Sequence, residues 1–203
     1  MATLAETTAD VYADPSRERL GTAANVVTLV RTVATVVLAG LAVQQDSLTL
    51  LVSSLAVYWV GDLADGAIAR LWGCETRIGA VLDILSDRLS AAGFYLGVAW
   101  MTPDLVWPVL VYLTEFMVVD AFLSLAFLAW PIRSPNYFYV VDRPLWLWNW
   151  SKPGKAANSA LFAVLLLLTG SAALGLAVAG ALLVLKSVSL VRLIRLGLPV
   201  PPR

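Results

Sequence analysis

The sequence has no histidine, a single cysteine and few charged residues. Of its 203 residues, 14% are charged and none is histidine. Histidine-based acid–base catalysis is therefore excluded, as are zinc or iron sites that need an imidazole ligand. Cys74 alone can form neither an intrachain disulfide nor a Cys-x-x-Cys metal site. Because 14 basic residues balance 14 acidic ones, no net charge favours nucleic acid as a partner.

Apolar residues are present in excess. They make up 60% of the sequence, and mean hydropathy is +0.80, whereas a soluble domain has about 45–50% apolar and about 25% charged residues. The composition therefore indicates an integral membrane protein. The first 20 residues hold several charges and no continuous apolar stretch. We interpret residues 1–23 as a cytosolic or interfacial segment rather than a signal peptide.

Six apolar stretches are long enough to cross a bilayer, which takes about 20 residues per helix. They predict an all-α integral membrane protein, with a bundle of six transmembrane helices over residues 24–195 and a cytosolic tail at 196–203. The six stretches are 24–43, 48–70, 77–101, 104–131, 154–171 and 173–195.

Basic residues fall on only one side of this six-helix prediction. They precede the first helix, lie between helices two and three and between helices four and five, and follow the sixth. The other three connections carry no Lys or Arg, only Asp46 and Asp104. Because Lys and Arg favour cytoplasmic loops, we expect a multi-pass protein of the cell membrane with both termini and the functional site in the cytoplasm. The basic residues are Arg17, Arg19, Arg70, Arg77, Arg133, Arg143, Lys152, Lys155, Arg192, Arg195 and Arg203.

Four aspartates interrupt the apolar sequence at regular spacing. Asp62 and Asp65 lie three residues apart in the second span, and Asp83 and Asp87 lie four apart in the third. Each pair shares a helix face, and a short loop joins the two helices, so the acidic faces can converge. A charged residue near a bilayer centre costs roughly 2.5–3.5 kcal/mol on insertion scales, and hard cations take carboxylate ligands. We therefore predict that the four aspartates bind Mg²⁺ or Mn²⁺, as two ions.

Small and basic residues accompany these aspartates. Gly66, Ala69 and Gly79 leave the helix surfaces bare, which suits either a ligand close to the backbone or close packing of helices. Arg70, at the end of the second span, is suited to pairing with a phosphate or to anchoring the helix at the cytoplasmic interface. Because four carboxylates lie nearby, we favour ligand binding over helix packing or membrane anchoring at all four of these positions.

The string from Asp62 to Asp87 resembles the signature of the CDP-alcohol phosphotransferases, D-x-x-D-G-x-x-A-R-x8-G-x-x-x-D-x-x-x-D. All eight signature positions are present with this spacing. Asn25-x-x-Thr28-x-x-Arg31 is also similar to the family's first-helix pattern, with Ala24 in place of the usual proline. The resemblance implies a transferase that moves a phosphatidyl-type group from a CDP-linked lipid such as CDP-diacylglycerol to an alcohol and releases CMP.

The resemblance also implies roles for individual residues. Asp62, Asp65, Asp83 and Asp87 match the metal ligands, and Asp87 matches the residue proposed as general base. Members of the family are often homodimers, so we expect a homodimer. The positions that match the CDP-lipid site are Asn25, Thr28, Asp65, Gly66, Ala69, Arg70 and Gly79.

The acceptor alcohol is predicted from basic residues alone. Ser151-Lys152-Pro153-Gly154-Lys155 loosely resembles a basic element of phosphatidylglycerophosphate synthases. The basic residues favour a phosphorylated acceptor such as glycerol 3-phosphate or inositol phosphate. Phosphatidylglycerol, as in a cardiolipin-type synthase, is the alternative. The candidate acceptor-binding residues are Arg31, Arg88, Arg133, Lys152 and Lys155, each of which could instead anchor the protein at the membrane surface.

A divalent cation transporter is the alternative from a different class. Transporters place their sites near the bilayer midplane on broken helices, whereas these aspartates lie towards the cytoplasmic helix ends. An intramembrane aspartyl protease needs only two aspartates and no metal. Glu115, Asp120 and Lys186 also fall within predicted spans, where charges indicate function. They can pair with one another or with Arg31.

Overall fold

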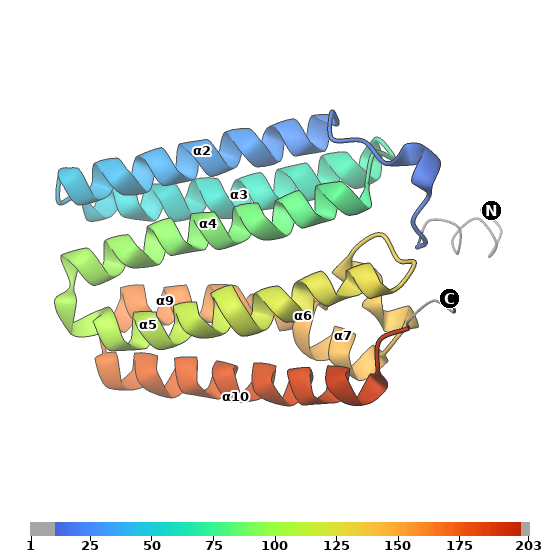
Figure 1. The fold of residues 1–203 in the computed structure, drawn as a ribbon. Helices are drawn as coiled ribbons and strands as arrows, with labels where there is room; N and C mark the ends of the chain where they lie inside the picture. The colour runs from blue at the N-terminus through green and yellow to red at the C-terminus, as the bar shows by residue number, and fades with distance from the viewer. Residues whose placement is uncertain (1–10, 200–203) are drawn as a thin grey trace.

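The computed structural model describes residues 11–199, and this part of the chain consists of helices joined by turns and loops, with an isolated bridge between Tyr12 and Ile132. The predicted all-α class is therefore confirmed. After a short turn, η1 (Pro15–Arg17), three long helices follow one another. They are α2 (Ala23–Gln44), α3 (Leu48–Leu71) and α4 (Arg77–Met101), and they lie side by side in one half of the molecule (Figure 1).

The other half is built from interrupted helices. The rod from residue 103 to 129 consists of η2 (Pro103–Leu105), α5 (Val106–Thr114), η3 (Glu115–Asp120), α6 (Ala121–Leu125) and η4 (Ala126–Ala129). The connection after it contains η5 (Pro135–Val140) and α7 (Arg143–Asn149). The chain then continues through α8 (Lys152–Lys155), η6 (Ala156–Ala160), α9 (Leu161–Thr169) and α10 (Ala172–Leu196). Both η3 and η6 are π-helical turns.

Hydroxyl side chains begin the long helices. Thr22, Ser47, Thr76 and Ser171 each accept a hydrogen bond from the backbone N–H three residues later, at 3.0–3.4 Å. Such N-caps satisfy amide groups that have no partner inside the helix. Gly170 ends α9 with a φ of 56°, the left-handed conformation that glycine adopts without strain. The predicted break between the last two apolar stretches therefore lies at this glycine.

Each predicted apolar stretch coincides with a helical segment to within two residues at either end. In the described part of the chain, four segments are long and apolar enough to cross a membrane. They are Ala23–Gln44, Leu48–Leu71, Pro103–Ala129 and Ala172–Leu196. Four candidate spans thus follow from the structure, and the six-helix transmembrane bundle stays a prediction.

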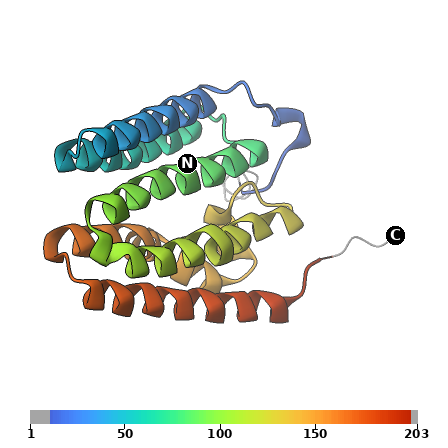
Figure 2. The same cartoon turned by 60° about the vertical axis from the view of Figure 1, so that its left-hand side comes forward.

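Helix α4 joins the two halves, because it packs against α2 and α3 on one side and α5 and α6 on the other. Helix α10 packs against α5 and α9, and Figure 2 shows the same division from a second side. The start of α2, the loop between α3 and α4 and the end of α10 all lie at one end of the bundle (Figure 1). The basic connections predicted to be cytoplasmic thus share one end.

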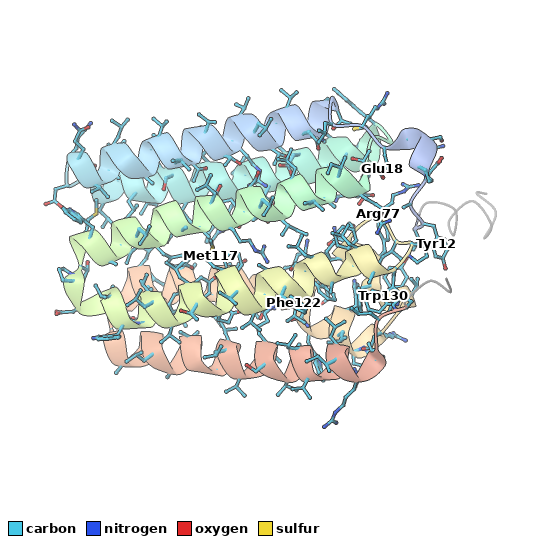
Figure 3. All side chains as sticks on the ribbon, viewed as in Figure 1. Tyr12, Glu18, Arg77, Met117, Phe122 and Trp130 are labelled. Carbon is cyan, nitrogen blue, oxygen red and sulfur yellow. The ribbon has the colours of Figure 1, made fainter. Side chains whose placement is uncertain are left out.

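Aromatic side chains fill the core between α4, α5 and α9. The Tyr112 ring lies 4.3 Å from Phe162 and 4.6 Å from Tyr95, measured between ring centroids. Large apolar side chains on the outer surface, such as Met117 and Phe122 (Figure 3), are exposed, as expected of helices that face lipid.

Residues 11–22 cross the end of the bundle that holds the basic connections (Figure 3). The Ala13 N–H donates to the Pro131 carbonyl at 2.9 Å. The Glu18 carboxylate accepts from the backbone N–H groups of Arg77 and Ile78 at 2.9 and 3.1 Å, so it caps α4 with a negative charge. The predicted division into 1–23, 24–195 and 196–203 stays a prediction, and residues 1–10 and 200–203 lie outside the described part.

Candidate active site

The side chains of the four aspartates meet between α3 and α4. One carboxylate oxygen from each of Asp62, Asp83 and Asp87 lies within 4.8 Å of the others. The side chains of Asp62 and Asp83 are 42% and 40% exposed, whereas that of Asp65 is 5% exposed and lies behind them. An open group of three carboxylates, backed by a buried fourth, offers oxygen ligands to a divalent ion from one side.

Arg31 of α2 lies in the middle of this cluster. Its Nε donates to Asp65 Oδ2 at 2.7 Å, and its Nη2 donates to Asp83 Oδ1 at 2.6 Å and Asp87 Oδ1 at 2.9 Å. The same Nη2 is 3.6 Å from Asp62 Oδ1. The cluster keeps three more negative than positive formal charges, so its donor set fits hard divalent cations such as Mg²⁺ or Mn²⁺.

Two further contacts hold Arg31 and Asp65 in place. Thr28, one turn before Arg31, donates its hydroxyl to Asp65 Oδ2 at 2.7 Å. Gly61 lies directly under the arginine, since a Cβ at this position would come within 2.6 Å of both Cβ and Cδ of Arg31. The sequence pattern did not assign a role to Gly61, although it directly precedes the first signature aspartate.

The signature glycines contact neighbouring side chains closely. A Cβ at Gly79 would lie 2.8 Å from both Asn25 Oδ1 and Thr76 Oγ1, so the glycine lets the first turn of α4 approach α2. A Cβ at Gly66 would lie 3.2 Å from Nη1 of Arg70, which folds back over this glycine. The close approach of the Asn25 and Thr76 side chains thus explains why a glycine is needed at position 79. At Gly66, the guanidinium of Arg70 lies over the bare helix surface.

A cavity of about 210 Å³ lies in front of the carboxylates. Its lining comes from both halves of the molecule and includes all four aspartates. Every residue predicted to contact the CDP-lipid lines it as well, namely Asn25, Thr28, Asp65, Gly66, Ala69, Arg70 and Gly79. The structure therefore brings the metal-binding and lipid-binding candidates together at one cavity.

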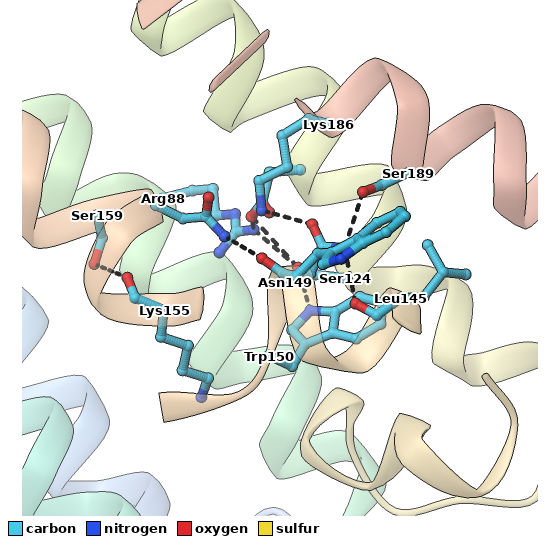
Figure 4. A network of polar contacts seen from close by, with 12 residues as sticks. Arg88, Ser124, Leu145, Asn149, Trp150, Lys155, Ser159, Lys186 and Ser189 are labelled. Carbon is cyan, nitrogen blue, oxygen red and sulfur yellow. Dashed lines mark hydrogen bonds and ion pairs between the residues drawn. The ribbon is translucent and has the colours of Figure 1, made fainter. Parts of the chain in front are cut away.

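A second charged cluster lines the same cavity from the other half (Figure 4). Asp120 forms ion pairs with Arg88 and with Lys186, whose Nζ is 2.5 Å from Asp120 Oδ1. Lys186 also donates to Asn149 Oδ1 at 2.9 Å, and Asn149 Nδ2 donates to Ser189 Oγ at 3.0 Å. The intramembrane charges Asp120 and Lys186 thus pair with each other. Asn149, within the aromatic run before α8, carried no sequence signal for this role.

The five candidate acceptor residues do not gather at one place. Arg31 lies within the aspartate cluster, and Arg88 pairs with Asp120. Arg133 donates from Nε to the Tyr12 carbonyl at 3.0 Å. Lys155 is exposed and lines the cavity. Lys152 is exposed at the start of α8 and is not part of the cavity lining.

Outside the long helices, Asp142 connects the α7 segment to α10. Its carboxylate accepts from the Leu145 N–H at 2.8 Å and from Arg192 Nη2 at 2.9 Å. Burial acts to raise the pKa of Asp142, but the hydrogen bonds from Arg192 and the Leu145 N–H outweigh burial and hold that pKa below its usual range.

The fold and the carboxylate cluster define an α-helical, membrane-embedded protein whose cavity is suited to divalent cations. The chain belongs to the CDP-alcohol phosphatidyltransferase family, whose sequence profile matches residues 21–192. The resemblance carried by the eight signature positions is thereby confirmed.

Similar curated proteins are phosphatidylinositol phosphate synthases. That of Mycolicibacterium smegmatis is 35% identical over 72 residues, which are 32% of this chain and 32% of the relative. Those of Mycobacterium bovis and Mycobacterium tuberculosis are 39% identical over 85 residues, 40% of this chain and 38% of each relative. The chain thus matches only about a third of the length of these relatives. No solved structure gives a significant match.

Proposed function

We propose that this protein transfers a phosphatidyl-type group from CDP-diacylglycerol, or a similar CDP-lipid, to a polyol phosphate and releases CMP. The observation that carries the proposal is the meeting of all four signature aspartates and all predicted CDP-lipid residues at one cavity. The exposed apolar surface of the surrounding helices suits a lipid substrate, whose acyl chains can stay in the bilayer while its headgroup enters the cavity.

The metal ligands would be Asp62, Asp65, Asp83 and Asp87. Their oxygen-only donor set and excess negative charge support two ions of Mg²⁺ or Mn²⁺. When bound, such ions neutralise the bridging diphosphate and make CMP a better leaving group.

Asp87 is the proposed general base. The acceptor hydroxyl gives its proton to an Asp87 oxygen and attacks the lipid-proximal phosphorus, whose bond to the CMP oxygen then breaks. Arg31 orients Asp87 through the 2.9 Å hydrogen bond from Nη2. At the same time Arg31 and Thr28 hold the buried Asp65. A single arginine thus sets the positions of carboxylates from both helices.

The acceptor is a polyol phosphate, and inositol phosphate is the first candidate. The similarity to proteins named phosphatidylinositol phosphate synthases supports this choice. The basic groups of Lys155 and Arg88 on the cavity wall support a phosphorylated acceptor. Glycerol 3-phosphate is the second candidate.

The proposal includes six membrane spans, a cytoplasmic site and a homodimer. Asp83, Asp87 and Arg88 of α4 line the cavity between the helices, which supports α4 as a membrane span whose charges face the cavity. The shared position of the basic connections at the end of the bundle that holds the α3–α4 loop supports a cytoplasmic site with both termini on that side.

The test is CMP release from CDP-diacylglycerol by purified protein, with Mg²⁺, Mn²⁺ or EDTA. The acceptors are inositol phosphate, glycerol 3-phosphate, phosphatidylglycerol and unphosphorylated inositol. We expect metal-dependent CMP release with a polyol phosphate. Absence of CMP release with every acceptor, together with Mn²⁺ flux into proteoliposomes, would favour a cation transporter instead.

Replacing Asp87 with Asn tests the general base. Asn cannot take the proton, so turnover should fall by at least about 100-fold, while CDP-lipid binding stays largely intact. Asp104→Asn is the matched control, because Asp104 is exposed in η2, in the connection after α4 and outside the cavity lining. Normal turnover by the Asp87→Asn protein would refute the assignment.

A further inference from the structure

Two helical rods carry a π-helical turn where they border the cavity. One is η3, and the other is η6, which directly follows Lys155. A π turn adds a residue to one helical turn and is frequent at functional sites. In η6 it places Asn158 and Ser159 on the cavity wall together with Lys155.

Asn158 has a buried amide oxygen without a partner. The residue is 7% exposed, and its Nδ2 donates to the Trp148 carbonyl at 3.0 Å. Because a carbonyl can only accept, this bond identifies which end of the amide is Nδ2 and leaves Oδ1 as the other. Among the described residues, no donor reaches Asn158 Oδ1. Buried polar groups normally have a partner, so this acceptor, which belongs to a residue of the cavity lining, is suited to a donor from a ligand.

The neighbouring polar side chains are already engaged. The Ser159 hydroxyl donates to the Lys155 carbonyl at 3.0 Å (Figure 4). Asn149 uses Oδ1 for Lys186 and Nδ2 for both Leu145 and Ser189. Unlike Asn149, Asn158 therefore keeps an amide acceptor for a ligand.

Asn158 shares its cavity with the reacting groups. Lys155, Asp62 and Asp87 line this cavity as well. Asn158 is three residues further along the same helical rod, within the π turn η6, and lines the same cavity as Lys155. A molecule whose hydroxyl reaches Asp87 can thus present another hydroxyl to Asn158.

We propose that Asn158 is a specificity-determining residue, whose Oδ1 accepts a hydrogen bond from a second hydroxyl of the acceptor. This inference rests on the proposed function, since it concerns the acceptor of that reaction. The first hydroxyl loses its proton and attacks phosphorus, whereas the second keeps its proton and donates to Asn158. A polyol satisfies both positions, and a simple alcohol leaves the amide oxygen without a donor.

The experiment compares the wild type with Asn158→Leu on matched acceptors. The acceptor pairs are inositol phosphate against its monodeoxy analogues, and glycerol 3-phosphate against 3-hydroxypropyl phosphate, which lacks the middle hydroxyl. For the wild type, we expect kcat/KM to fall about tenfold when the critical hydroxyl is removed. For the Asn158→Leu variant, kcat/KM on the full polyol should be about tenfold lower than for the wild type. Its kcat/KM should be the same for the full polyol and the deoxy acceptor, and its KM for CDP-diacylglycerol should equal that of the wild type.

Two variants separate specificity from folding. Ser159→Ala, in the same π turn, should retain wild-type discrimination because its hydroxyl is satisfied within the helix. Asn158→Asp keeps an oxygen acceptor, so it should retain the preference for the full polyol even if the lost bond to Trp148 lowers stability. If Asn158→Leu does not fold, Asn158→Asp and Asn158→Ala provide the same comparison with and without the acceptor atom.

The outcomes distinguish the two proposals. If the wild type releases no CMP with any polyol phosphate, the proposed function is wrong and this inference falls with it. If CMP is released but the variants without the amide oxygen discriminate deoxy acceptors as the wild type does, the proposed function stands and the role of Asn158 is refuted.

Discussion

Replacing Arg31 with leucine is expected to destabilise the protein more than any change at an exposed charge. Arg31 is 3% exposed, and its guanidinium donates to Asp65, Asp83 and Asp87 at 2.6–2.9 Å. Without it, carboxylates from α3 and α4 face one another with no protein cation between them. Removing one partner from a buried ion pair costs about 3–5 kcal/mol, because the remaining charge stays buried.

The lower end of that range is the better expectation for Arg31→Leu. Asp62 and Asp83 are about two-fifths exposed, so water partly compensates them, whereas Asp65 is 5% exposed and loses its 2.7 Å donor. We therefore expect the free energy of unfolding in EDTA to fall by about 3 kcal/mol. Divalent ions should restore part of this loss, since they bind the folded carboxylates and not the unfolded chain.

The assay is denaturant unfolding of the purified protein in mixed micelles, with EDTA and with saturating Mg²⁺. Arg31→Lys keeps a charge but loses the forked geometry, so it should fall between the wild type and the leucine variant. Arg19→Leu, at an exposed arginine, is the matched control and should change stability by less than about 0.5 kcal/mol. An Arg31→Leu protein as stable as the wild type in EDTA would refute the role of Arg31 as the cation that holds the two acidic faces together.

Two further predictions concern positions near the site and outside the membrane. The Cβ of Gly79→Ala would displace Asn25 Oδ1 and Thr76 Oγ1. This variant should therefore lower stability by about 1 kcal/mol, the usual effect of losing an N-cap, and weaken CDP-lipid binding. Gly40→Ala, where a Cβ meets nothing within 4 Å, is the control in the same unfolding and binding assays. Asp142 has a pKa held below its usual range, so its bond to Arg192 contributes stability above the unfolded pKa of about 3.9, and that contribution is lost as pH falls through the folded value. The difference in stability between the wild type and Asp142→Asn should therefore shrink from pH 6 to pH 3, and a difference that stays constant would contradict this account.

Much of the local structure could be predicted from the sequence. The apolar stretches located the helices to within two residues because bilayer-length hydrophobicity, N-capping hydroxyls and a left-handed glycine act over a few neighbouring positions. Helical periodicity likewise acts over neighbouring positions, so the spacing within the pairs Asp62/Asp65 and Asp83/Asp87 was enough to place each pair on one helix face. The family was also recognisable from the sequence, since eight signature positions lie within 26 residues of continuous chain.

The partners of charged side chains could not be predicted in this way. Arg31 was a candidate for binding the acceptor, and the sequence did not indicate that its guanidinium lies among the aspartates, where the close approach of α2 to α3 at Gly61 directs it. The sequence left open whether Asp120 and Lys186 pair with each other or with Arg31, and the observed pairing of Asp120 with Lys186 depends on how α10 packs against the η3 rod. Such contacts join residues far apart in the chain, and helical periodicity does not specify the rotation of one helix against another.

The four regularly spaced aspartates, the helix bounds and the family were thus determined by the sequence alone, because each depends on residues close together in the chain. The tertiary structure decided which cation lies among those aspartates and, among the described residues, which buried amide of the cavity lining keeps an acceptor without a partner. The π turn at Asn158 shows the reason most directly: one added residue per turn changes which side chains face inwards, and only packing against neighbouring helices determines where that turn forms.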